Sequence, residues 1–133
     1  MLMQLTTTCA FFSSAVLIAW LVLFLHDLLT PGYRTWVEIH RGNLSAGLAA
    51  AGQILGIGII AHFAITHTHE HLLISIIWTA GGGVLMILGY LLFEFLTPKL
   101  NVGHEIANDN RAVGVVSFAI SIAAATILAA CMP

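Results

Sequence analysis

Histidine is the side chain best suited to chemistry in this sequence, and three of the seven histidines stand close together. His67, His69 and His71 alternate with Thr68 and Glu70. Imidazole nitrogens at this spacing, with a carboxylate beside them, can converge on zinc or copper. The segment has no His-Glu-x-x-His pattern of a zinc protease. It could also act as a pH-sensitive loop or be a loop that is merely polar.

Two further histidines and one amide fall inside apolar stretches: His26, His62 and Gln53. A polar group left unpaired in lipid costs a few kcal/mol, so each of these side chains needs a partner or a function. Either histidine could ligate haem or chlorophyll through a ring nitrogen, although their different depths argue against one shared ring. Hydrogen bonding to a neighbouring helix is the alternative for all three, and Gln53 could instead line a pore.

The remaining residues do not support catalysis. No Ser or Cys stands in a local motif with a base, and no glycine-rich phosphate loop is present, so we expect no enzyme. Four Lys plus Arg and a formal charge of −2 cannot neutralise a phosphate backbone, which excludes nucleic acid as a partner.

The elements that position these groups follow from composition. The 133 residues are 59% hydrophobic and 8% charged, with a mean hydropathy of +1.00, so lipid is the solvent for most of the chain. A bilayer core about 30 Å thick needs roughly 20 apolar residues in a helix. The predicted fold is therefore all-α, with four transmembrane helices over residues 9–29, 44–65, 72–93 and 112–131.

The basic residues predict the orientation. Arg34 and Arg41 lie in the first predicted loop, Lys99 and Arg111 in the third, and the other loop and the termini carry none. Because cytoplasmic loops retain Lys and Arg, we expect these two loops in the cytoplasm and both termini on the periplasmic side of a bacterial inner membrane.

An internal duplication divides the chain into residues 1–66 and 67–133. A shift of 67 residues aligns Leu29-Thr30-Pro31 with Leu96-Thr97-Pro98, and also aligns Glu38 with Glu105, Asn43 with Asn110 and Gly47 with Gly114. Each repeat holds two spans, which predicts parallel repeats related by a pseudo-twofold axis along the membrane normal. Glu38, Asn43, Glu105 and Asn110 are either duplicated helix-boundary residues or a symmetric polar vestibule for a cation.

Local signals around the first copy predict its helix ends. Thr35-Trp36-Val37-Glu38 fits a capping box that begins a short interfacial helix. Asn43 and Asn110 are placed to cap the spans that follow them.

Small residues indicate where helices pack, because lipid-embedded helices associate through close contact. Gly52 and Gly56 form a Gly-x-x-x-Gly on the second span, and Ser117 and Ser121 recur on the fourth. We expect these two spans to meet each other or a neighbouring subunit. Gly81-Gly82-Gly83 on the third span marks another close contact or a bend.

The segments Glu38-Ile39-x-x-x-Asn43-x-Ser45-Ala46 and Ile106-x-x-x-Asn110-x-Ala112-x-Gly114, with the closing Ala129-Ala130-Cys131-Met132, resemble the YjfL family. This is a family of small bacterial inner-membrane proteins, catalogued as domain of unknown function 350. The resemblance spans nearly the whole chain and implies four helices in two repeats, with an occasional link to envelope stress and no established reaction. Ser45 stands where the family pattern leads us to expect Ala, and the histidine-rich loop is not part of that pattern.

These features predict a non-enzymatic inner-membrane protein that acts as an oligomeric subunit, either ion-conducting or structural. The alternative is an accessory subunit of a redox or light-harvesting complex, with or without a porphyrin on His62 or His26. The lipid bilayer is the expected surrounding, with partners being further copies or a larger membrane complex.

Overall fold

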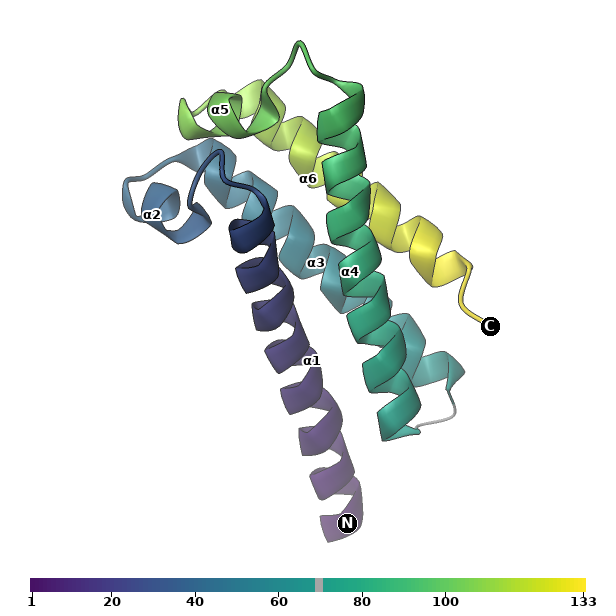
Figure 1. The fold of residues 1–133 in the computed structure, drawn as a ribbon. Helices are drawn as coiled ribbons and strands as arrows, with labels where there is room; N and C mark the ends of the chain where they lie inside the picture. The colour runs from purple at the N-terminus through teal and green to yellow at the C-terminus, as the bar shows by residue number, and fades with distance from the viewer. Residues whose placement is uncertain (69–70) are drawn as a thin grey trace.

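The computed structural model describes residues 1–68 and 71–133, and these residues contain helices and no strands. The helices are α1 (Leu2–Leu29), α2 (Thr35–His40), α3 (Leu44–His67), α4 (Leu72–Leu96), α5 (Val102–Ala107) and α6 (Arg111–Ala130). The short helix α2 lies between α1 and α3 in the chain, and α5 lies between α4 and α6. Figure 1 shows both short helices at one end of the bundle.

The four long helices are each long and apolar enough to cross a membrane, which confirms the prediction of an all-helical chain with four candidate spans. The largest difference is at α1, which begins at Leu2 and not near residue 9. The Thr6, Thr7 and Thr8 hydroxyls donate to backbone carbonyls three or four residues earlier. Their hydroxyls are thereby hydrogen-bonded within the helix, so the helix continues through this stretch.

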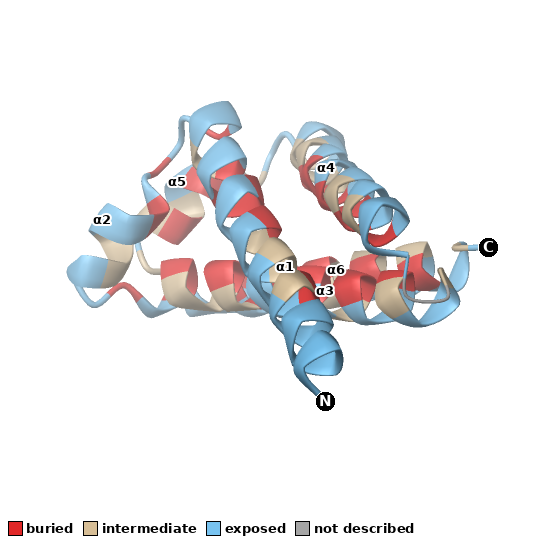
Figure 2. Cartoon of the chain, turned by 90° about the horizontal axis from the view of Figure 1, so that it is seen from below, coloured by how far each residue is buried: buried red, intermediate tan, exposed pale blue. Residues whose placement is uncertain are grey.

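Helices α3 and α6 form one layer and α1 and α4 lie across it (Figure 2). The α3–α6 contact is made by backbone. A Cβ atom built on Gly52 would lie 2.7 Å from Phe118 Cα, and one built on Gly114 would lie 2.7 Å from Ser45 Cα. Any side chain larger than hydrogen at these two positions would push the helices apart, and close approach of this kind is what holds helices together in lipid.

The apolar core lies where the two layers meet. Ile57 and Ile60 of α3 pack with Val22 of α1 and Met86 of α4, all of them buried. A Cβ on Gly56 would lie 2.5 Å from the Met86 methyl carbon and 3.2 Å from Ala125 Cβ, so this glycine makes room for α4 and α6 together.

The two short helices, α2 and α5, lie at the same end of the bundle, which we call the α2/α5 end (Figure 1). There Gly32 and Gly103 meet so closely that a Cβ on Gly32 would lie 2.8 Å from Gly103 Cα. Arg34 and Lys99 therefore lie at one end of the molecule, in the loops that precede α2 and α5.

The predicted short helix after the first span is present as α2, but the predicted capping box is wrong. Arg34 is the N-cap of α2, and its own side chain makes no capping hydrogen bond. Thr35 is the first helical residue, and its N–H donates to Asp27 Oδ1 of α1 at 3.3 Å. The Asp27 carboxylate takes the capping role because the chain turns back onto the end of α1.

Candidate functional site

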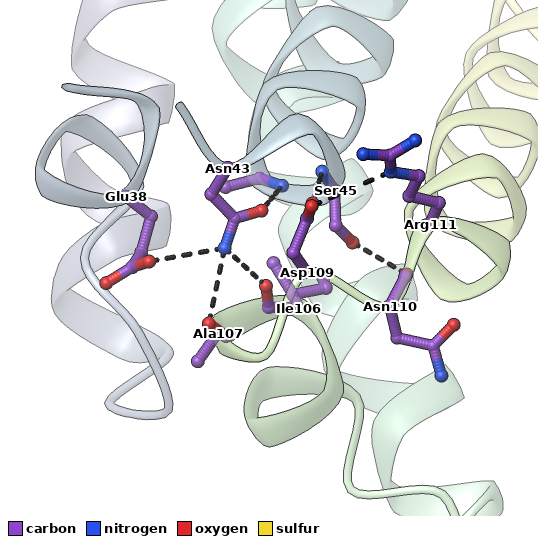
Figure 3. A network of polar contacts seen from close by, with 9 residues as sticks. Glu38, Asn43, Ser45, Ile106, Ala107, Asp109, Asn110 and Arg111 are labelled. Atoms are coloured by element: carbon purple, nitrogen blue, oxygen red, sulfur yellow. Dashed lines mark hydrogen bonds and ion pairs between the residues drawn. The ribbon is translucent and has the colours of Figure 1, made fainter. Parts of the chain in front are cut away.

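Two of the four polar side chains predicted from the duplication, Glu38 and Asn43, belong to a hydrogen-bonded cluster at the α2/α5 end that joins α2–α3 to α5–α6 (Figure 3). We call this cluster the polar latch. It consists of Glu38, Asn43, Ser45, Asp109 and Asn110, with backbone carbonyls of α5.

Asn43 is the centre of the polar latch. Its Oδ1 accepts from the Ala46 N–H at 2.9 Å and so caps α3, which is the role the sequence predicts for it. Its Nδ2 donates to the Ile106 carbonyl at 2.7 Å and the Ala107 carbonyl at 3.3 Å, both at the end of α5. One buried amide therefore satisfies the start of one helix and the end of another.

Ser45 and Asp109 complete the polar latch, and the sequence did not single out Asp109. The Ser45 N–H donates to Asp109 Oδ1 at 2.9 Å, and the Ser45 hydroxyl donates to the Asn110 carbonyl at 2.9 Å. Asp109 adopts a left-handed φ of 55°, a conformation that Asp tolerates better than most residues. A signal was present in the sequence, because a shift of 67 residues places Asp109 opposite Gly42.

The two glutamates are occupied by partners within their own repeat. Glu38 accepts from Arg41 at 3.0 Å through Oε1 and from Asn43 at 3.2 Å through Oε2. Glu105 Oε2 accepts from Asn110 Nδ2 at 2.6 Å. Asn110 begins α6 but makes no side-chain capping bond, since its amide turns to Glu105. This geometry favours the helix-boundary interpretation of the four residues over an open vestibule.

A second polar group lies inside the bundle, where α1, α3 and α4 meet. Gln53 Nε2 lies 2.8 Å from His26 Nδ1, and the Tyr90 ring stands edge-on to the imidazole with centroids 4.6 Å apart. All three side chains are buried. His26 Nε2, Gln53 Oε1 and the Tyr90 hydroxyl have no hydrogen-bond partner among the described residues. The His26–Gln53 pair fits the predicted role of a polar tie between helices, here α1 to α3.

Tyr33, in the loop after α1, is buried in the same apolar cluster as Tyr90. Burial raises the pKa of Tyr33 to about 12, with smaller contributions from Asp27 and Glu94. The phenol therefore stays neutral at cellular pH and adds no charge to the α2/α5 end.

The other predicted residues are dispersed. His62 is exposed on α3 and lines a cleft between α3 and α1, whereas His26 is buried near the other end of α1. Ser117 and Ser121 are buried on α6, where the Ser121 hydroxyl donates to the Ser117 carbonyl at 3.0 Å. His67 and His71 lie at the α3–α4 turn, while His69 lies outside the described residues. Residues 1–68 and 71–133 contain no group of three His, Cys, Asp or Glu able to hold a metal ion.

Comparison with known proteins adds a family. Residues 1–132 match the model of a family described as Domain of Unknown Function (DUF350). The chain is also 42% identical, over 127 residues, to the UPF0719 transmembrane protein YshE of Bacillus subtilis (strain 168). That alignment covers 96% of this chain and 93% of the relative. No solved structure matches.

The two asparagines offer a matched test of the polar latch. We predict that Asn43→Ala lowers the free energy of unfolding by about 2–3 kcal/mol, because it removes the cap of α3 and the hydrogen bonds from Nδ2 to the Ile106 and Ala107 carbonyls. Asn110→Ala should cost about 1 kcal/mol or less, since it loses one bond to Glu105. Unfolding of both variants in detergent micelles measures the difference. Equal losses would show that the amide does not join the two halves.

Proposed function

This chain belongs to the DUF350 family, and from that premise we propose that it is a non-enzymatic, structural subunit of a homo-oligomer in the bacterial inner membrane. The predicted resemblance to the YjfL family is confirmed, because YjfL is a synonym for the same family. The transmembrane relative and the four apolar helices indicate a multi-pass membrane protein.

The main support for a homo-oligomer comes from the three consecutive glycines of α4, Gly81, Gly82 and Gly83. A Cβ on Gly82 would lie 2.7 Å from Ile60 Cγ2 of α3, and one on Gly83 would lie 2.5 Å from Val22 Cγ2 of α1. Gly82 and Gly83 therefore allow α4 to pack closely against α3 and α1. A Cβ on Gly81 meets no described atom within 4 Å, and Gly81 is exposed.

A glycine in a helix interior costs about 1 kcal/mol relative to Ala, and within this chain Gly81 gains nothing in return. Gly89 is equally unobstructed and lies eight residues further along α4, about 80° around the helix axis from Gly81. Small residues on a lipid-facing helix allow the backbone of another helix to approach. We infer that this face of α4 receives a second copy of the chain.

The polar latch favours the structural version of the subunit over the ion-conducting one. A cation vestibule needs carboxylate oxygens turned toward the ion. Both oxygens of Glu38 accept hydrogen bonds, one from Arg41 and one from Asn43, and Glu105 accepts one from Asn110.

Matching helix boundaries support the proposed tandem duplication. α1 and α4 end at Leu29 and Leu96, and α3 and α6 begin at Leu44 and Arg111, so both pairs differ by the predicted 67 residues. The two short helices obey the same shift. The polar latch departs from this symmetry, because Asn43 reaches the other half and Asn110 does not.

A second candidate function is the accessory subunit with a porphyrin on histidine. His26 is 2% exposed and hydrogen-bonded to Gln53, whereas His62 is exposed beside the cleft against α1, so the structure favours His62 as the ligand. A porphyrin absorption band in the protein purified from its own membrane would support this function. Zinc or copper binding by His67, His69 and His71 would be an additional property of either subunit.

Orientation gives one prediction. All four Lys and Arg lie at the α2/α5 end, which we assign to the cytoplasm, and this leaves the exposed Cys131 on the outer side. In a Cys9→Ser background, a membrane-impermeant maleimide added to spheroplasts should label Cys131. A Cys9→Ser, Cys131→Ser, Lys99→Cys variant should react only after lysis. The opposite pattern would invert the topology.

The oligomer gives a second prediction. Gly81→Phe should shift the purified protein from oligomer to monomer, because the phenyl ring occupies the surface that a partner helix would approach, while the monomer has room for it. Light scattering coupled to size-exclusion chromatography measures the mass. Gly58→Phe is the control, since Gly58 is also exposed and unobstructed but lies on α3. A wild-type protein that is already monomeric would contradict the proposal.

Ion flux separates the structural subunit from the conducting one. We predict that purified protein in liposomes gives no K⁺ or Na⁺ flux above that of empty liposomes. Flux that falls in a Glu38→Gln, Glu105→Gln double variant would instead establish the conducting version and a vestibule at the α2/α5 end.

A further inference from the structure

A small pocket lies where the end of α3, the start of α4 and the residues after α6 meet, at the end of the bundle away from the α2/α5 end (Figure 1). Its volume is about 310 Å³, and we call it the α3–α4 pocket. His67, His71 and Met132 are among its lining residues. Their imidazole nitrogens and thioether sulfur are the three donor groups in the pocket that bind soft metal ions.

The His67 ring is held with one nitrogen free. Its Nδ1 lies 3.0 Å from the Phe63 carbonyl oxygen and donates to it, since a carbonyl can only accept. The Phe63 ring stacks on the imidazole, with 15° between the planes and centroids 5.5 Å apart. With the proton on Nδ1, the lone pair is on Nε2. A histidine that binds a metal through one nitrogen almost always donates its other N–H to a carbonyl, a carboxylate or water, and His67 already makes this bond.

His71 lies on the α4 side of the same turn. It is the N-cap of α4, but its side chain makes no capping hydrogen bond. Its N–H donates to the Thr68 carbonyl at 3.1 Å, and the Thr68 and Ser75 hydroxyls lie 2.6 Å apart. These bonds fix the end of α3 to the start of α4, so the backbone positions of the two histidines are set before any ion binds.

Met132 brings the third donor from the other end of the chain. It follows α6, is half-buried, and packs against the apolar core that contains Ile57 and Ile60. Its neighbour Cys131 is exposed and is not among the residues that line the pocket. In residues 1–68 and 71–133 no third His, Cys, Asp or Glu joins the two histidines. The thioether is therefore the third ligand that the pocket offers.

This donor set selects the metal. Zinc sites are built from Cys, His, Asp and Glu, whereas a thioether is a ligand of monovalent copper, which imidazole also binds. We propose that the α3–α4 pocket binds one Cu(I) ion through His67, His71 and Met132. This site differs from the three-histidine site expected from the sequence in its third ligand and in its preference for copper over zinc. It is formed within one chain and does not depend on the proposed oligomer.

Competition for Cu(I) tests the site. A thiol would bind Cu(I) by itself, so the protein is purified in a Cys9→Ser, Cys131→Ser background, where both exchanged side chains are exposed. It is titrated against the coloured Cu(I)–bicinchoninate complex, with ascorbate keeping the copper reduced. We expect one Cu(I) per chain. Met132→Leu and His67→Gln should each weaken binding at least about tenfold, the lower bound of what losing even an outer-shell partner costs a metal site.

Two matched variants control for nonspecific binding. Met3→Leu and His104→Gln change the same residue types at exposed positions on α1 and α5, and they should leave Cu(I) affinity unchanged. Equal affinity in the Cys-free protein and its Met132→Leu variant would overturn the proposed site. So would loss of binding in His69→Gln alone, which would assign the metal to the three histidines of the sequence.

A second measurement uses the Cys-free protein with its pocket intact and does not depend on how the pocket variants fold. X-ray absorption at the copper edge should show two imidazole nitrogens and one sulfur around Cu(I), and this sulfur can come only from a methionine. A copper shell without sulfur would overturn the role of Met132. An equal concentration of Zn²⁺ should not displace the bound Cu(I), and displacement would contradict the preference for copper.

Discussion

The backbone contact between α3 and α6 is the constraint on which the rest of the structure depends. In lipid, burial of apolar side chains gives no net attraction between helices, so association relies on close packing and polar ties. Gly52 and Gly114 let the two backbones touch, against Phe118 and Ser45. The other layer is built onto this pair, with Met86 of α4 seated over Gly56 and Val22 of α1 seated against Gly83.

Buried polar groups find hydrogen-bond partners more completely at the α2/α5 end than inside the bundle. At the α2/α5 end, Asn43 and Ser45 hydrogen-bond to the backbone at the end of α5 and the start of α6, and so tie the two halves of the chain together. Inside the bundle, His26 and Gln53 tie α1 to α3 but leave three buried polar atoms without partners in the described chain, counting the Tyr90 hydroxyl. The latch is therefore well satisfied, whereas the interior tie carries a desolvation cost that side chains within the bundle do not offset.

Some glycines lie at close contacts within the chain, and others have free space where a Cβ would stand. Gly52, Gly82 and Gly83 each face an atom closer than 3.0 Å to where a Cβ would stand, whereas Gly58 and Gly81 face none within 4 Å in the described residues. Gly58 opens onto the α1–α3 cleft, and Gly81 lies on the outer face of α4. In a membrane, such surfaces meet either lipid or another helix.

The sequence by itself determined four candidate membrane spans, most of their ends and the capping of α3 by Asn43, because these depend on apolar length and on contacts within three or four residues. It also indicated that small residues would bring the second and fourth spans together. It did not identify Asp109, and it placed the start of α1 too late. Thr6, Thr7 and Thr8 are polar by sequence, although their hydroxyls donate to carbonyls of their own helix. Only the tertiary structure decided that Asn43 reaches Ile106 and that His26 finds Gln53. These pairings join residues 63 and 27 positions apart, and helix rotation and crossing fix them where no local pattern can.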